Sequence, residues 1–115
     1  MTTAAVASRL AELCKAGEFI QAQKELYDAN IKRIDPDGGV SEGKATMHQQ
    51  EEKFLAGLDR IHNISVSEPQ VAGSYFSVIL MMEVDVKNVG HRKFEEVCVY
   101  RVLDGKIIFE QFFRG

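Results

Sequence analysis

The sequence contains no tryptophan, only two prolines and only two cysteines among its 115 residues. The two cysteines, Cys14 and Cys98, lie far apart, without the close spacing of a zinc knuckle or a redox CxxC motif. We therefore expect two buried thiols, because free cysteines are among the most buried residue types.

The chain also lacks an excess of positive charge and a long apolar run. Its 14 basic and 17 acidic residues leave no surplus to neutralise a phosphate backbone, so nucleic acid is not an expected partner. The longest apolar stretch, Val78–Met82, is far shorter than the about 20 residues of a membrane span, so no membrane is expected. Within Met1–Gly17, Arg9, Glu12 and Lys15 interrupt any secretory signal, which predicts a cytoplasmic protein.

What the chain does contain is enough for one folded unit. It is 45% hydrophobic and 27% charged, which is typical of a globular domain, and its length predicts a single domain over residues 1–115. No P-loop, GxGxxG, HExxH, GxSxG or CxxC motif occurs. The sequence therefore predicts neither nucleotide hydrolysis, dinucleotide redox chemistry, zinc proteolysis nor serine hydrolysis.

The first half of the chain has helical periodicity. Apolar residues recur at spacings of three and four up to Gly17, again over Glu18–Ala29, and again over Lys44–Ile61. A short alternation over Asn30–Asp35 predicts a strand that ends at a Pro-Asp-Gly-Gly turn. We therefore expect three helices, with one short strand between the second and the third.

The second half has the composition of strands. Ile64–Val71, Ser74–Lys87, Phe94–Leu103 and Lys106–Arg114 are rich in β-branched and aromatic residues, and Asp104-Gly105 predicts a tight hairpin between the last two. Together these elements predict an α+β fold, in which one face of a twisted antiparallel sheet is covered by the N-terminal helices.

A two-residue loop at Asp104-Gly105 predicts the register of the last hairpin. Cys98 would then lie opposite Gln111, and Tyr100 opposite Phe109. The helix-facing side would carry Glu96, Cys98, Tyr100, Val102, Ile107, Phe109, Gln111 and Phe113, and the other side Val97, Val99, Arg101, Ile108, Glu110 and Phe112. A bulge in this hairpin would exchange the two sets on the last strand and place Glu110 inside.

Both predicted faces are largely apolar, yet three helices can cover only one of them. The other face is expected to pack against a second copy in a homodimer, through Val97, Val99, Arg101, Ile108 and Phe112. The alternative is a monomer whose outer face is amphipathic, with Arg101 and Glu110 in solvent.

The three histidines do not suggest a metal or cofactor site. His48 and Glu52 are one helical turn apart, but two ligands are too few, so we interpret them as a surface pair. His62 is expected to interact with the dipole at the end of the third helix, and His91 to lie in a hairpin loop. We therefore expect neither a metal ion nor a cofactor.

The order of several short motifs resembles a known family. Leu26-Tyr27-Asp28, Ile34-Asp35-Pro36, Glu42-Gly43 and the closing segment Asp104–Ile108 follow one another as in the SnoaL-like branch of the nuclear transport factor 2-like superfamily. The resemblance implies a cone-shaped, cystatin-like α+β barrel that encloses an apolar pocket, usually in a dimer. It implies no single activity, because the superfamily includes isomerases, cyclases, hydrolases, dehydratases and non-enzymatic domains.

Ketosteroid isomerases of this superfamily offer a specific comparison. The resemblance places Asp35-Pro36 at the general-base position of those enzymes, but Leu10 at the tyrosine donor and Cys98 at about the second donor. Without these donors, which are worth on the order of 3 kcal/mol each, isomerisation by that mechanism is not expected. Asp35 remains either a general base for other chemistry or a turn-forming residue before proline.

These observations predict a small-molecule-binding domain with a largely apolar pocket and no complete catalytic set. The pocket is expected to be lined by Tyr27, Met47, Phe54, Glu96, Cys98, Tyr100, Phe109, Gln111 and Phe113. Two alternatives stay open: an isomerase, cyclase or hydratase that uses Asp35 as its base, and a protein-interaction module whose cone is filled by side chains.

Overall fold

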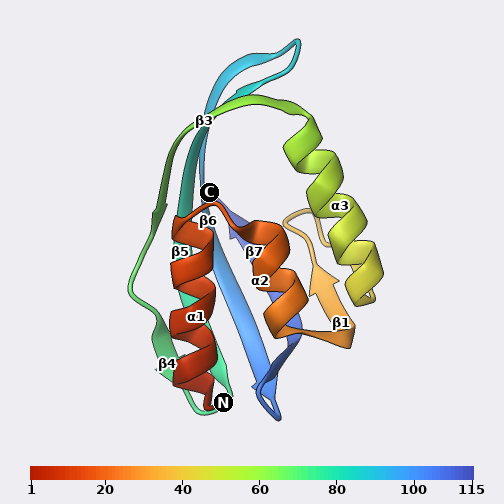
Figure 1. Ribbon diagram of the computed structural model, residues 1–115, viewed down its shortest axis with the longest axis vertical. Helices are drawn as coiled ribbons and strands as arrows, with labels where there is room; N and C mark the ends of the chain where they lie inside the picture. The colour runs from red at the N-terminus through yellow and green to blue at the C-terminus, as the bar shows by residue number, and fades with distance from the viewer.

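Three helices lie against one face of a curved sheet in the computed structural model, which describes residues 1–115 (Figure 1). The sheet has seven strands. The elements follow one another as α1 (Thr3–Lys15), α2 (Phe19–Leu26), β1 (Tyr27–Ile34), β2 (Val40–Glu42), α3 (Lys44–Ala56), β3 (Leu58–Val66), β4 (Gln70–Ala72), β5 (Tyr75–Val86), β6 (Gly90–Leu103) and β7 (Lys106–Arg114). This arrangement confirms the α+β fold.

Helices α1 and α2 form the predicted hairpin. The Thr2 hydroxyl accepts a hydrogen bond of 3.0 Å from the backbone N–H of Ala5, and this caps the start of α1. Gly17, at φ 76°, ends the first helix in the left-handed conformation that glycine tolerates. Helix α2 is shorter than predicted because Tyr27 already belongs to β1. No helix is long and apolar enough to cross a membrane.

The third helix is also shorter than predicted. It ends at Ala56, with Gly57 at its C-cap, whereas the apolar spacing predicted a helix as far as Ile61. The residues from Leu58 onward instead form β3, which pairs antiparallel with β5. His62 consequently lies in a strand, not at a helix end. Pairing with β5 satisfies the backbone groups on one side of this edge strand, and it outweighs the local helical pattern.

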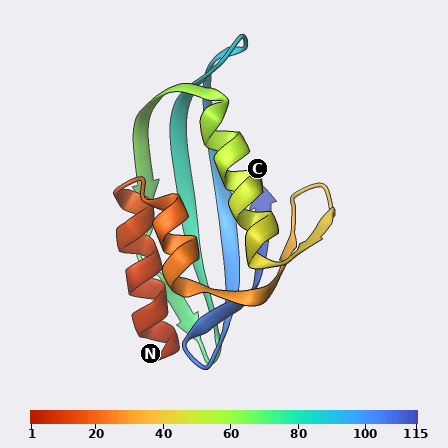
Figure 2. The same cartoon turned by 45° about the vertical axis from the view of Figure 1, so that its right-hand side comes forward.

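The sheet is mixed, because one pair of strands is parallel. The strand order is β2-β1-β7-β6-β5-β3, with β4 paired to β5 beyond this path. Strand β1 joins β7 in parallel, while every other pair is antiparallel, so the predicted purely antiparallel sheet is corrected at this point. The sheet does not close on itself, and its curvature wraps it around the helices (Figure 2).

The last hairpin has the predicted turn but not the predicted register. Leu103 pairs with Lys106 across the turn, where Asp104 and Gly105 both have positive φ. A bulge then follows: Val102 pairs with Ile107, but Arg101 pairs with Phe109. The extra residue turns the remainder of β7 over, so that Tyr100 lies opposite Glu110 and Cys98 opposite Phe112.

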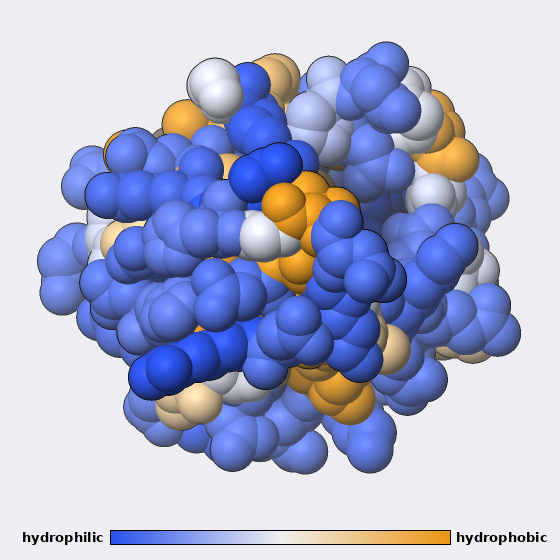
Figure 3. Space-filling view, turned by 90° about the horizontal axis from the view of Figure 1, so that it is seen from above, coloured by the Kyte–Doolittle hydropathy of each residue, from blue (hydrophilic) through white to orange (hydrophobic).

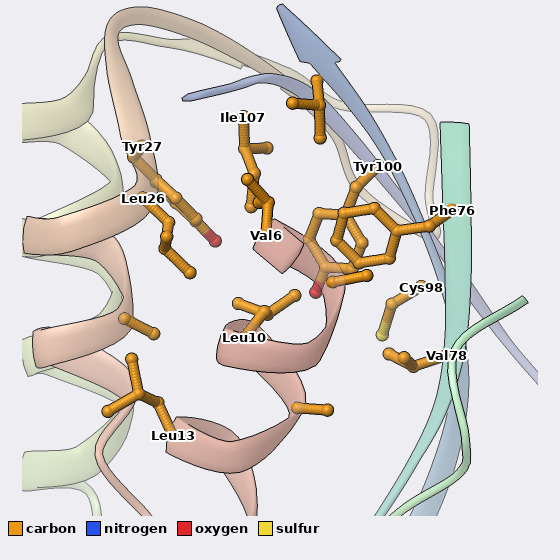
Figure 4. Packing of buried hydrophobic residues seen from close by; sticks show 14 of the residues in the cluster. Val6, Leu10, Leu13, Leu26, Tyr27, Phe76, Val78, Cys98, Tyr100 and Ile107 are labelled. Atoms are coloured by element: carbon orange, nitrogen blue, oxygen red, sulfur yellow. The ribbon is translucent and has the colours of Figure 1, made fainter. Parts of the chain in front are cut away.

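The hydrophobic core lies between the helices and the concave face of the sheet. Leu10 on α1 points toward a stack of Phe76 and Tyr100, whose ring centroids are 4.8 Å apart (Figure 4). Near it, the hydroxyl groups of Tyr27 and Tyr100 also point into the interior (Figure 4). Apolar side chains therefore fill the interior near α1. Buried polar side chains lie near β1 and β7.

Candidate functional site

A cavity of about 320 Å³ lies between the three helices and the concave face of the sheet. Twelve of its twenty lining residues are hydrophobic. The lining residues are Leu10, Cys14, Phe19, Ala22, Gln23, Tyr27, Arg33, Asp35, Pro36, Gln50, Glu51, Phe54, Leu80, Met82, Phe94, Glu96, Cys98, Tyr100, Phe112 and Arg114. Side chains therefore do not fill the whole space between the helices and the sheet.

Alternation along β6 brings several predicted residues to this cavity. Glu96, Cys98 and Tyr100 face the helices and line the wall, as the two-residue period of a strand requires. Tyr27 and Phe54 also line it.

Four predicted pocket residues do not line the cavity. Met47 is fully buried in the core on the inner side of α3. Phe109, Gln111 and Phe113 do not face the interior, because the bulge in β7 turns this part of the strand over. Phe112, which we expected on the outer face, lines the cavity for the same reason.

A buried ion pair between Arg33 and Glu110 lies beside the cavity. Glu110 on β7 is completely buried and accepts hydrogen bonds from the Tyr27 hydroxyl at 2.5 Å and from Arg33 Nε at 2.7 Å. Arg33 Nη2 lies 2.6 Å from the same carboxylate, and Arg33 Nη1 donates to Gln50 at 3.0 Å. Tyr27 and Arg33 are brought beside Glu110 by the parallel pairing of β1 with β7. The sequence showed Glu110 inside only as the consequence of a bulge.

A second ion pair lies on the same wall, nearer the end of β7. Arg114 Nη2 donates to Glu96 Oε2 at 2.8 Å, and its guanidinium group lies 4.8 Å from the ring centroid of Phe94. Glu96 is 9% exposed, so this pair also neutralises a carboxylate that is largely removed from water.

Two further carboxylates line the cavity without a hydrogen-bonded partner. Asp35 lies directly after β1 and its side chain lines the cavity. Its backbone N–H donates a 2.8 Å hydrogen bond to the carbonyl of Gly39, which holds the turn. Glu51 lies on α3, and burial raises its pKa, although the nearby Arg33 opposes the shift. With both guanidinium groups already paired, the cavity carries an excess of acidic groups. No signal in the sequence indicated that Glu51 lines this cavity.

Glu51 gives a testable pH dependence. A carboxyl group whose pKa is raised by folding binds more protons in the folded state, so its unfavourable contribution to stability grows as the pH rises above the ordinary value of 4.5. Glu51→Gln should therefore unfold at a higher urea concentration than the parent at pH 7, and this gain should disappear toward pH 4. The exposed neighbour Glu52→Gln is the control; an equal gain in that variant would contradict the assignment.

The cavity wall also carries a buried tyrosine hydroxyl and two thiols. Burial keeps the pKa of the Tyr100 hydroxyl well above its usual range, and its hydrogen-bond partner in the chain is the Cys98 side chain, which is a weak acceptor. Burial likewise raises the pKa of Cys14 and of Cys98 to about 12, so neither thiol is a nucleophile at neutral pH. Tyr100 is thus a neutral donor whose weak contact with sulfur a ligand oxygen can replace.

His48 and two positions singled out by the resemblance have structural roles. His48, expected to pair with Glu52, instead lies with Nδ1 2.6 Å from Gln23 Oε1, and this contact joins α3 to α2. Leu10 and Cys98 both line the cavity. The two positions at which the resemblance places the donors of ketosteroid isomerases therefore hold a hydrocarbon and a weak donor.

Comparison with known proteins agrees with this architecture. A structure from Mesorhizobium loti, described as a candidate SnoaL-like polyketide cyclase and also as a carbohydrate phosphatase, is 30% identical over 98% of this chain and 99% of its own, with a TM-score of 0.91. A protein of unknown function with a cystatin-like fold from Xanthomonas campestris has a TM-score of 0.82 at 16% identity, covering 100% of this chain and 92% of its own. A candidate SnoaL-like polyketide cyclase from Jannaschia sp. CCS1 has a TM-score of 0.79 at 15% identity, covering 97% and 84%.

Two comparisons of sequence complete this picture. No curated protein matches the chain. The family model of the SnoaL-like domain matches residues 1–114, which is nearly the whole sequence. This confirms the resemblance that the order of short motifs indicated: the chain belongs to the SnoaL-like domain family.

Proposed function

We propose that this protein binds a small organic molecule with an apolar body inside the cavity. The observation that carries the proposal is a cavity of about 320 Å³ whose mostly apolar wall includes the Tyr100 hydroxyl, which has only the weak Cys98 sulfur as its partner. Ligand sites of folded proteins are usually concave, mostly apolar and about 300–1,000 Å³ in volume, with a few polar groups that orient the ligand. A carbonyl or hydroxyl oxygen of the ligand would accept the hydrogen bond from Tyr100.

The charges of the cavity select among ligands. Arg33 is paired with Glu110, and Arg114 is paired with Glu96, so the charge of each guanidinium group is already balanced by a carboxylate. Asp35 and Glu51 then add uncompensated acidic groups. A ligand carboxylate would be repelled in a site of low dielectric constant, whereas a neutral or cationic ligand would not. The description of the Mesorhizobium loti relative as a candidate polyketide cyclase fits a neutral, ring-shaped ketone.

A matched ligand series tests this proposal. We expect 2-naphthol and 2-naphthylmethylammonium to bind at least about tenfold more tightly than 2-naphthoate, which corresponds to about 1.4 kcal/mol. Calorimetric titration would give the affinities, and NMR shifts of cavity residues would locate the ligand. Tyr100→Phe should weaken 2-naphthol binding by about three- to tenfold, because one neutral hydrogen bond contributes about 1 kcal/mol. Equal affinity for the carboxylate would contradict the charge argument.

Asp35 supports a second candidate function, proton abstraction from carbon. Its side chain lines the cavity, as a general base must, and the cavity also holds the neutral donor Tyr100 to stabilise an enolate oxygen. We expect the protein to accelerate deuterium exchange at the acidic C–H groups of 2-tetralone. Asp35→Asn should remove at least about 90% of this acceleration, because a general base typically raises a reaction rate by about 10²–10⁴-fold. Asp37→Asn, an exposed substitution in the same turn, should retain it; equal rates in all three samples would exclude this function.

The proposal includes a homodimer formed through the outer face of the sheet. Ile79, Val97 and Phe113 are direct cross-strand neighbours on β5, β6 and β7, and they are 48%, 41% and 51% exposed. A contiguous apolar row on three adjacent strands is costly in water and is self-complementary about a two-fold axis. Tyr75 and Arg101, whose guanidinium lies 5.5 Å from the tyrosine ring centroid, extend the same face.

We also propose a cytoplasmic location. Both cysteines are free, and nothing in the chain uses a disulfide for stability. Free, inert thiols fit a reducing compartment.

A further inference from the structure

A second cluster of chemically active side chains lies on the outer face of the sheet, away from the cavity. His62 comes from β3, Asp85 from β5 and His91 from β6, near the hairpin that projects at one end of the molecule (Figure 1). Asp85 and His91 are direct cross-strand partners. The surface of this end is mostly hydrophilic (Figure 3). The sequence predicted His62 at a helix end and His91 in a hairpin loop, whereas the structure places them in β3 and β6.

The three side chains converge at coordination distances. His62 Nε2 lies 2.8 Å from Asp85 Oδ2, and His91 Nδ1 lies 3.1 Å from Asp85 Oδ1. All three potential ligand atoms lie within 4.8 Å of one another, and the two imidazole centroids are 5.2 Å apart. Tetrahedral coordination at bond lengths of about 2.0–2.2 Å requires ligand atoms about 3.3 Å apart. Only small rotations of partly exposed side chains separate the observed positions from that geometry.

We propose that His62, Asp85 and His91 form a binding site for a divalent transition-metal ion of the zinc class. Two imidazole nitrogens and one carboxylate oxygen are ligands that Zn²⁺ and Co²⁺ bind well. Three protein ligands leave a coordination position for water. The ion would tie β3 to the β5–β6 hairpin, where the backbone of three strands already holds the ligands in place.

Glu83 contacts the ring nitrogen of His91 that does not face the proposed metal ion, as a carboxylate often does beside a metal-binding histidine. Its carboxylate lies 2.8 Å from His91 Nε2, on the side of the imidazole ring opposite to Asp85. A hydrogen bond from Nε2–H to Glu83 fixes the tautomer in which Nδ1 carries the free lone pair, directed toward Asp85 and His62. Glu83 is thus a positioning residue in the proposed site, because it acts through His91.

Titration of the metal-free full-length protein with Zn²⁺ tests the site. We expect one ion per chain, and His62→Ala and His91→Ala should each weaken binding by at least about 100-fold. Glu83→Gln should weaken it by about 10- to 100-fold, the range typical of outer contacts. His48→Ala, which removes the third histidine on the opposite side of the molecule, is the matched control and should bind within about twofold of the parent, as expected for a residue outside the site.

Cobalt provides a readout that does not depend on the folding of any variant. The parent protein with Co²⁺ should show ligand-field absorption without a sulfur-to-metal charge-transfer band, and saturating Zn²⁺ should raise its unfolding temperature until EDTA is added. Absence of saturable binding would overturn the proposal. A thiolate charge-transfer band, or full affinity in both His62→Ala and His91→Ala, would equally overturn it, because the ion would then lie elsewhere.

Discussion

Replacing Glu110 with alanine is expected to lower the free energy of unfolding by about 3–5 kcal/mol, because it leaves the Arg33 guanidinium buried without its counter-charge. The Tyr27 hydroxyl loses its acceptor in the same variant. Urea denaturation of both proteins at pH 7 would measure the difference. In a domain of this size such a loss is a large part of the total stability.

The charge and the packing of Glu110 can be separated by further variants. Arg33→Met combined with Glu110→Leu removes both charges and leaves apolar side chains of similar length, so we expect most of the lost stability to return. Glu95→Ala, on an exposed site of β6, should change stability by less than about 0.5 kcal/mol. A Glu110→Ala variant as stable as Glu95→Ala would show that this ion pair does not hold β1 against β7.

Placing a charge on the outer face is expected to convert a dimer into a monomer. By light scattering after size exclusion, the parent should have twice the chain mass of 12.9 kDa, and Val97→Lys should have 12.9 kDa. Val97 is 41% exposed in the single chain, so the lysine can reach water and the monomer should stay folded.

A matched substitution elsewhere controls for the effect of added charge. Val40 on β2 is 58% exposed and lies outside the apolar row formed by Ile79, Val97 and Phe113. Val40→Lys should therefore keep the dimeric mass. A parent protein of 12.9 kDa at micromolar concentration would refute the proposed dimer and favour the amphipathic monomer.

The fold was largely accessible from sequence because its signals are local. Apolar spacing placed all three helices, and Asp104-Gly105 placed the closing turn correctly. The end of the third helix was wrong because Leu58 and Ile61 fit a helical stripe, while the partner that makes them a strand, β5, lies more than ten residues away.

The cavity was accessible only in part. Tyr27, Phe54, Glu96, Cys98 and Tyr100 reach its wall because strand alternation and helix periodicity fix the direction of a side chain locally. For the residues of β7 after the bulge, the same rule predicted the wrong face of the sheet. One extra residue reverses the direction of every side chain that follows.

By itself, the sequence determined the α+β class, the order of the elements, the family and an interior that side-chain alternation makes apolar, because these depend on residues close together in the chain. Only the tertiary structure decided that Glu110 is buried with Arg33 and Tyr27, that Glu51 lines a cavity, and that His62 meets His91. Each of those contacts depends on strand register, and a register is set jointly by segments that are distant in sequence.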